Sequence, residues 1–124
     1  MNVVDSSGWI EYFFGRPNAA FFRAPIQATG TLIVPAICIA EVVRYVTRAA
    51  NCDVAQEVSA QMRRATVVDL DGNLADVAAR LSLKHNLPLA DAIVYATAQV
   101  TKAILFTQDD DFAKLQGVKY VRKK

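Results

Sequence analysis

Short β-branched and aliphatic runs alternate with longer segments of helical periodicity along all 124 residues. The strand-like runs are Asn2 to Val4, Thr31 to Val34, Thr66 to Leu70, Ala103 to Phe106 and Lys119 to Val121. Such alternation is typical of a parallel sheet whose strands are connected by helices. The sequence therefore predicts an α/β fold with a parallel central sheet of about five strands flanked by helices, a Rossmann-like α/β/α arrangement.

The intervening segments predict the helices. They run over Gly8 to Phe14, Asn18 to Gln27, Ile37 to Ala50, Val54 to Arg64, Leu74 to about Leu81, and Pro88 to about Ala98. Pro25 is expected to bend the second helix, and Ser6 and Ser7 are expected to form a turn before the first one. A chain of this length has room for one core, so a single domain over residues 1–124 is expected.

Cysteine usage and hydropathy indicate a cytoplasmic protein. No signal-peptide pattern follows Met1, and no apolar run is long enough to cross a bilayer. Cys38 and Cys52 stand far apart without a Cys-x-x-Cys motif or a Cys/His cluster. Both are therefore expected to be reduced thiols in the core.

Two acids follow predicted strands directly. Asp5 comes after the first strand, and Asp109 lies in the acidic run that follows Ala103 to Phe106. Ligands of open parallel sheets bind outside the carboxyl ends of the strands, so both acids are candidate site residues. A second interpretation remains open for Asp5, because Asp5 or Ser6 could simply cap the helix that follows.

Two further acids lie on helices near the same edge. Glu41 falls about one turn after the second strand, with Arg44 and Arg48 on the same helix side. Asp91 is the only acid of a helix that is apolar nearly all round. The structural alternatives are a solvated Glu41–Arg44 pair worth a few tenths of a kcal/mol, and for Asp91 a favourable place in the field of the helix dipole.

Bringing these four acids together requires either protonation of some of them or a cation among them. Right-handed crossovers would carry Asp5, Glu41, Asp91 and Asp109 to one edge of the sheet. Two carboxylates about 4 Å apart repel by roughly 4 kcal/mol at an effective dielectric constant near 20. Oxygen ligands without histidine or thiolate suit Mg²⁺ or Mn²⁺, and such an ion can activate water for attack on a phosphodiester.

The charge balance suits a polyanionic substrate. The chain carries 14 basic and 12 acidic residues, a formal net charge of +2. With the four candidate acids set aside as a metal site, the remaining charges leave a basic surface around an acidic pocket. The basic tail Arg122 to Lys124 is expected to be a frayed end that could touch phosphate.

Four motifs in order carry a family resemblance. They are Val3-Val4-Asp5-Ser6-Ser7, Ala40-Glu41-Val42 after Val34-Pro35, Leu89-Ala90-Asp91-Ala92, and Thr107-Gln108-Asp109-Asp110-Asp111-Phe112. Together they resemble the PIN-domain nucleases, in particular the small ribonuclease toxins of VapBC toxin-antitoxin pairs. The resemblance covers nearly the whole chain. Each motif is weak alone, and four in register are fairly specific.

The resemblance implies a function and a set of roles. It implies a Mg²⁺-dependent endoribonuclease that acts on RNA, forms a homodimer and is neutralised by a small cognate antitoxin. The matching positions are Asp5, Glu41, Asp91 and Asp109 as the acidic quartet, Asp111 as a further metal-binding acid, and Ser6 and Thr107 as hydroxyls beside the metal. Which acid of the run Asp109 to Asp111 is the fourth ligand stays open.

Two interpretations go beyond the resemblance. Arg44 and Arg48 are inferred to contact backbone phosphates of a nucleic acid. The alternative function is a non-catalytic PIN-like module that binds RNA or protein through the aromatic helix Gly8 to Phe14 and the basic rim.

Overall fold

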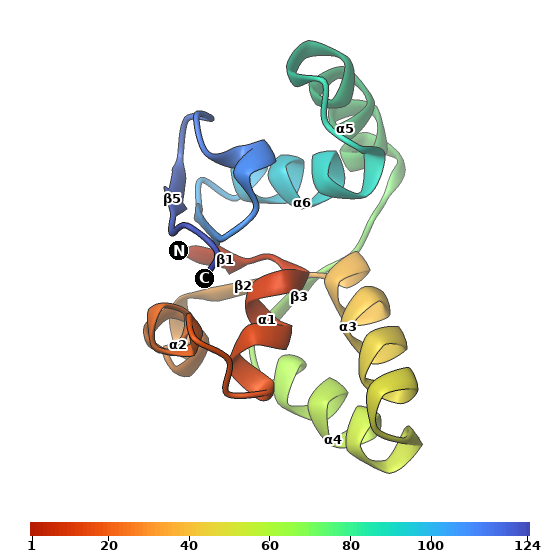
Figure 1. Ribbon diagram of the computed structural model, residues 1–124. Helices are drawn as coiled ribbons and strands as arrows, with labels where there is room; N and C mark the ends of the chain where they lie inside the picture. Colours follow the sequence, from red (N-terminus) through yellow and green to blue (C-terminus); the bar gives the residue numbers. More distant parts are fainter.

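The computed structural model describes all 124 residues and has five parallel strands in one sheet (Figure 1). The strands are β1 (Asn2–Val4), β2 (Leu32–Pro35), β3 (Thr66–Val68), β4 (Ile104–Thr107) and β5 (Val118–Tyr120). Their order across the sheet is β3-β2-β1-β4-β5, and every neighbouring pair is parallel. The predicted fold class is therefore confirmed.

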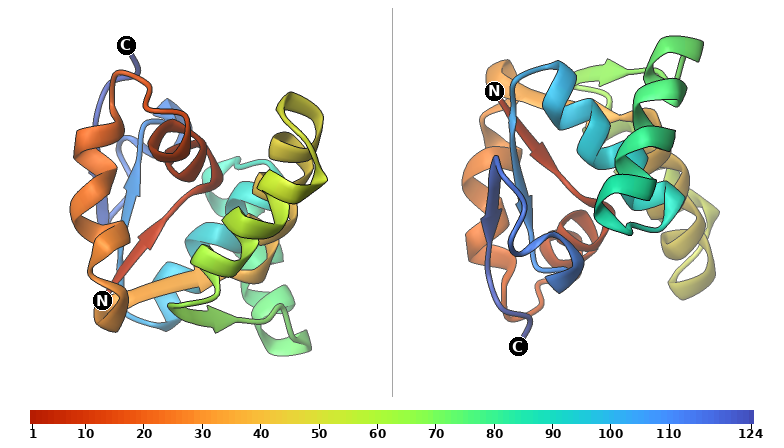
Figure 2. Two further views of the ribbon diagram at one scale, coloured as in Figure 1. Left: turned by 90° about the horizontal axis from the view of Figure 1, so that it is seen from below. Right: turned by 90° about the horizontal axis from the view of Figure 1, so that it is seen from above.

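Six α-helices cover the two faces of this sheet. They are α1 (Ser6–Phe13), α2 (Ala19–Gln27), α3 (Ala36–Ala49), α4 (Cys52–Met62), α5 (Gly72–His85) and α6 (Leu89–Val100), with short 3₁₀ turns η1 (Thr29–Thr31) and η2 (Asp110–Phe112). Helices α1 to α4 lie on one side of the sheet, and α5 and α6 lie on the other (Figures 1 and 2). None of them combines the length and apolar character needed to span a membrane.

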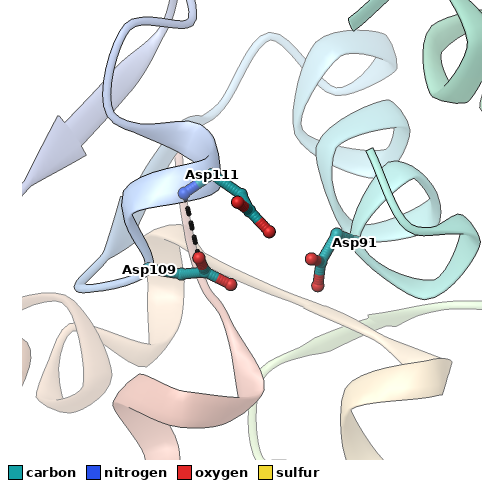
Figure 3. Close-up of side chains that lie close together, drawn as sticks. All are labelled: Asp91, Asp109 and Asp111. Atoms are coloured by element: carbon teal, nitrogen blue, oxygen red, sulfur yellow. Dashed lines mark hydrogen bonds between the residues drawn. The ribbon is translucent and has the colours of Figure 1, made fainter. Parts of the chain in front are cut away.

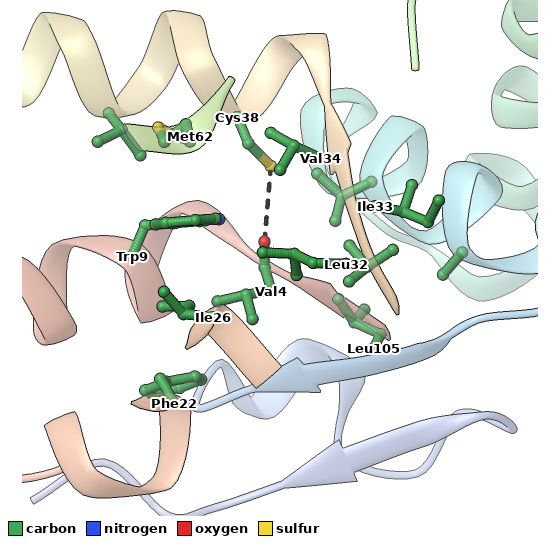
Figure 4. Close-up of a cluster of buried hydrophobic side chains, with 14 of the residues drawn as sticks. Val4, Trp9, Phe22, Ile26, Leu32, Ile33, Val34, Cys38, Met62 and Leu105 are labelled. Atoms are coloured by element: carbon green, nitrogen blue, oxygen red, sulfur yellow. Dashed lines mark hydrogen bonds between the residues drawn. The ribbon is translucent and has the colours of Figure 1, made fainter. Parts of the chain in front are cut away.

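The central strand β1 organises the sheet. Val3 and Val4 are fully buried, and Val3 pairs with Ile33 of β2 on one side and Leu105 of β4 on the other. Strands covered by helices on both faces are apolar throughout, which is why the sequence shows continuous runs here and not alternation. On the α1–α3 side, the core fills with Trp9, Phe22, Cys38 and Met62 (Figure 4).

The strand order creates a switch point between β1 and β4. From β1 the chain proceeds to β2 and β3 in one direction, and then returns across the sheet to β4 on the opposite side of β1. Beyond the carboxyl ends of two such strands the connections diverge and leave a crevice, which is where open α/β sheets bind ligands. Asp5 and the acidic run after Thr107 lie at this point.

Several predicted boundaries differ from the observed ones, and two of them are wrong for local reasons that the structure shows. Ser6 and Ser7 are the first residues of α1 and not a turn, because the Asp5 side chain accepts a hydrogen bond from the backbone N–H of Gly8 at 2.9 Å and caps the helix. Pro35 is the last residue of β2, paired with Val68, and not the residue after the strand. Its extended backbone also makes it the N-cap of α3.

The prediction for one cysteine is also wrong. Cys38 is buried in the core as expected, but Cys52 is exposed. Cys52 is the first residue of α4, in the turn that follows α3 at the end of both helices far from the sheet (Figure 1). The core-facing positions of α4 are Ala55, Val58 and Met62, all further along the helix.

Gly8 is required by the close approach of α1 to the sheet, which yields a stability prediction. A Cβ at this position would lie 2.6 Å from Phe22 and 2.7 Å from Val4, and both neighbours are fully buried. Gly8→Ala should therefore lower the free energy of unfolding by about 1–3 kcal/mol through overpacking. Chemical denaturation measures the change.

Gly72→Ala is the matched control. Gly72 is the first residue of α5, and a Cβ there meets nothing within 4 Å. This variant should be as stable as the wild type or slightly more stable, because alanine is the better helix former. Equal stability of the two variants would contradict the packing argument.

Candidate metal centre

Three carboxylates converge beside the switch point. Asp91 lies in the first turn of α6, Asp109 follows β4, and Asp111 lies in η2. One oxygen of each lies within 4.8 Å of the others, and the three side chains point toward one another (Figure 3). The Asp109 carboxylate also accepts the backbone N–H of Asp111 at 3.0 Å, which fixes the turn that presents both acids.

Asp5 joins this group through a buried hydroxyl. The Thr107 hydroxyl donates to Asp5 Oδ2 at 2.6 Å, and Thr107 Oγ1 accepts the backbone N–H of Asp109 at 2.9 Å. Asp5 is 5% exposed and Thr107 fully buried. Asp5 is thus both the cap of α1 and a neighbour of the acidic cluster, so the two interpretations of this residue do not exclude each other.

Burial makes the negative charges of the cluster costly. Desolvation raises the pKa of Asp5 from 3.8 to about 6, opposed by the hydrogen bonds from Thr107 and Gly8 and reinforced by the charges of Asp109 and Asp91. Desolvation likewise raises the pKa of Asp91 to about 6, with the charges of Asp109, Asp111 and Glu41 adding to it. The site therefore favours the uptake of either protons or a cation.

Glu41 lies at the exposed rim of the cluster. It is outside the group of three oxygens within 4.8 Å, and it accepts a hydrogen bond from the Ser6 hydroxyl at 2.7 Å. Its charge nonetheless contributes to the raised pKa of Asp91. The predicted quartet thus gathers near the carboxyl ends of the strands, with Glu41 the most exposed of the four and Asp5 the most buried.

The run Asp109 to Asp111 divides in the structure. Asp109 and Asp111 belong to the group of three, whereas Asp110 does not. Asp110 begins η2 and, together with Asp109, lines a cavity toward the tail. The geometry thus sets Asp110 apart from the two acids on either side of it.

The donor set is oxygen only. Cys38 lies beneath the site, but burial and the charges of Asp5, Glu41 and Asp91 raise the pKa of its thiol far above the usual range, so no thiolate is present. The three clustered carboxylates match the preference of hard divalent cations for oxygen. These residues fit a Mg²⁺- or Mn²⁺-sized ion better than a zinc ion with its nitrogen and sulfur ligands.

The two predicted arginines lie next to the acids. Arg44 and Arg48 follow Glu41 by about one and two turns of α3 and are both exposed. With Ser6 and Glu41 they line a cavity of about 770 Å³. They are therefore placed where a phosphate chain leading to the acids could meet them.

A buried polar network beneath the site was not predicted. Glu11, 3% exposed, accepts hydrogen bonds from the backbone N–H of Asn18 at 3.0 Å and from Gln108 Nε2 at 3.1 Å. Gln108 Nε2 also donates to the Ser7 hydroxyl at 2.7 Å. One signal was available in the sequence: Glu11 is the only acid in an otherwise apolar, aromatic-rich helix, as Asp91 is in its own.

The fold agrees with the comparisons to known proteins. The model of the PIN domain family matches residues 3–118, so the chain belongs to the PIN domain family. No curated protein matches the chain. Three solved structures that resemble it share at most 23% of their sequence with this chain, so they show a similarity of fold.

Three solved structures superpose over nearly the whole chain. A toxin-antitoxin complex from Klebsiella pneumoniae has a TM-score of 0.80 at 23% identity, covering 96% of both chains. The VapC20 toxin of Mycobacterium tuberculosis, described as cleaving the sarcin-ricin loop, has a TM-score of 0.80 at 17% identity, and the match covers 99% of this chain and 100% of the toxin chain. VapBC2 from Rickettsia felis, bound to a fragment of its promoter DNA, has a TM-score of 0.74 at 12% identity, and the match covers 98% of this chain and 97% of the other.

The raised pKa of Asp5 predicts how the stability of the metal-free chain depends on pH. Asp5 titrates near 3.8 when exposed and about 6 when folded, so the folded state holds a proton that the unfolded state has released, and stability falls as pH rises through this window. Asp5→Asn removes this loss. On going from near pH 3.5 to pH 7, the variant should gain about 2–3 kcal/mol relative to the wild type.

Urea unfolding of both proteins at the two pH values, without divalent ions, measures this gain. Asp76→Asn, which changes an exposed acid on α5, is the control and should show no such gain. If the difference in unfolding free energy between the wild type and Asp5→Asn stayed constant with pH, Asp5 would have the same pKa in the folded and the unfolded chain.

Proposed function

We propose that this protein is a Mg²⁺-dependent endoribonuclease and the toxin of a toxin-antitoxin pair. The observation that carries the proposal is the convergence of Asp91, Asp109 and Asp111, with buried Asp5 behind them, at the switch point of a PIN-domain fold. Solved structures of similar fold include a toxin-antitoxin complex and a toxin that cleaves the sarcin-ricin loop, which supports both parts of the proposal.

In this proposal the acids have different roles in binding the ion. Asp5, Asp91 and Asp109 bind it, Asp111 completes the cluster, and Glu41 closes the exposed rim. Of the acidic run, Asp109 and Asp111 are chosen over Asp110 because only they lie in the cluster. The bound ion would supply an activated water molecule and neutralise charge that builds up on the phosphodiester.

The neighbouring hydroxyls and arginines position these groups. Thr107 holds Asp5 and the backbone of Asp109 at fixed separation, and Ser6 holds Glu41. Arg44 and Arg48 contact RNA phosphates from the adjacent cavity. A small cognate antitoxin and a homodimeric assembly belong to the same proposal, with Mn²⁺ as an alternative ion.

Loss of one carboxylate of the candidate metal centre should abolish activity. Asp5→Asn and Asp91→Asn remove ligands from the cluster while keeping side-chain volume, so each should lose metal-dependent RNA cleavage by at least about 100-fold, as removal of groups that stabilise transition-state charge does. The measurement is cleavage of a fluorescent RNA with Mg²⁺ and with EDTA, beside circular dichroism to show the fold. Asp76→Asn is the control and should cleave as the wild type does. Undiminished cleavage by Asp5→Asn would refute the proposed site.

A metal titration separates this enzyme from a non-catalytic binding module. The basic cavity beside the acids is the observation that favours such a module. An ion bound only by the native state raises the melting temperature, so Mg²⁺ or Mn²⁺ should stabilise the wild type and leave Asp91→Asn unchanged. No shift in either protein, together with no cleavage, would favour the module.

A further inference from the structure

Two cavities that contain basic residues adjoin the acidic cluster. The first, of about 770 Å³, lies between α1 and α3 and is lined by Ser6, Ser7, Glu41, Arg44, Tyr45 and Arg48. The second, of about 480 Å³, lies beside the tail and is lined by Ser7, Gln108, Tyr120, the acids Asp109 and Asp110, and the bases Arg122 and Lys123. Both volumes fall within the roughly 300–1,000 Å³ of ordinary ligand sites.

The cavities meet at the start of α1. Ser7 lines both of them, Glu41 belongs to the first, and Asp109 belongs to the second. Of the candidate acids, Glu41 and Asp109 therefore border the cavities on the two sides of Ser7. A ligand that filled both cavities would pass these two acids.

The first cavity suits a nucleotide with an unstacked base. Ile10, Ala40 and Ala49 supply apolar surface, and Arg44 and Arg48 supply positive charge. The Tyr45 ring, 37% exposed, is held from outside the cavity by Arg16, whose guanidinium lies 5.5 Å from the ring centroid and donates to the Tyr45 hydroxyl at 2.7 Å. An aromatic ring fixed at the edge of a basic cavity is a platform on which a base can stack.

The second cavity is a built site and not a flexible end. Arg122 and Lys123 belong to the tail that was expected to fray, but Asn18 Nδ2 donates to the Arg122 carbonyl at 3.1 Å and to Gln108 Oε1 at 2.9 Å. The backbone N–H of Val121 donates to the Thr107 carbonyl at 3.0 Å. The polar network under the site thus anchors the tail next to Asp109.

We propose that one RNA strand runs through both cavities and crosses the acids between them. The nucleotide on one side of the cleaved phosphate stacks on Tyr45, with its phosphates near Arg44 and Arg48, and the strand on the other side is held by Arg122 and Lys123. Consecutive nucleotides in separate cavities cannot stay stacked in a duplex, so the substrate is a locally single-stranded segment. This inference rests on the proposed function and adds the path of the substrate.

Binding measured without metal tests the path independently of cleavage. The probes are a labelled 12-nucleotide single-stranded RNA, the same RNA as a duplex, and a labelled oligoglutamate of equal charge, each followed by fluorescence anisotropy in EDTA. The variants are Arg44→Ala/Arg48→Ala, Arg122→Ala/Lys123→Ala and Tyr45→Ala. Arg80→Ala/Lys84→Ala removes two exposed charges from α5, which lines neither cavity, and is the matched control.

The expected pattern involves both cavities. The wild type should bind the single strand more tightly than the duplex. In each double variant of a cavity, the slope of log K (K is the association constant) against log salt concentration should decrease in magnitude by about 0.7 for every phosphate that the variant no longer neutralises. The control should keep the slope of the wild type. Tyr45→Ala should weaken binding at least about fivefold. Tyr45→Phe, which keeps the ring, should bind nearly as the wild type does.

Three results would overturn the proposal. The first is unchanged RNA binding in the variants of either cavity, and the second is equal binding of the duplex and the single strand. The third is binding of oligoglutamate that is as strong as RNA binding and as sensitive to the variants. That third result would indicate a surface for acidic protein. Cleavage by the wild type with any of these results would remove the path and keep the nuclease. The expected binding pattern without any cleavage in Mg²⁺ would keep the path and remove the nuclease.

Discussion

The structure depends on one buried carboxylate at the carboxyl end of the central strand. Asp5 ends the central strand β1, is 5% exposed, and is held by the Thr107 hydroxyl from β4 and the backbone N–H of Gly8 from α1. These two hydrogen bonds join β1 to the neighbouring strand β4 and to the helix α1 that follows β1. They only partly offset the cost of desolvation, as the raised pKa of Asp5 shows. The fold thus buries an acidic side chain where its negative charge is costly and where a bound cation would stabilise that charge.

The same residue sets the geometry of everything around the site. Because Asp5 caps α1, the helix begins at once, and Ser6 and Ser7 point from its first turn toward Glu41 and Gln108 respectively. Gly8 lets this turn approach Phe22 and Val4 closely. The start of α1 therefore carries the contacts to both cavities and fixes where they meet.

Much of the fold and the identity of the acids could be predicted from the sequence. Continuous apolar runs such as Leu32 to Val34 indicate strands covered on both faces, and Asp5 and Asp91 stand out as acids at a strand end and in an apolar helix. The errors were local. Ser6 and Ser7 were expected to form a turn because the sequence left open whether Asp5 or Ser6 caps the helix, and Cys52 was expected in the core because apolar residue type does not reveal which end of α4 leaves the sheet.

The sequence by itself determined the elements, the parallel sheet and the acids that could act together, because these follow from periodicity, from residue type and from the position of each residue at an element's end. Only the tertiary structure decided that Asp109 and Asp111 converge with Asp91 while Asp110 does not, and that Glu11, Gln108 and Asn18 anchor the tail beneath them. Such contacts join residues about 90 to 100 positions apart, such as Asn18 and Gln108 or Gln108 and Glu11. Their distances arise from how the helices pack on the sheet, which no local pattern in the chain encodes.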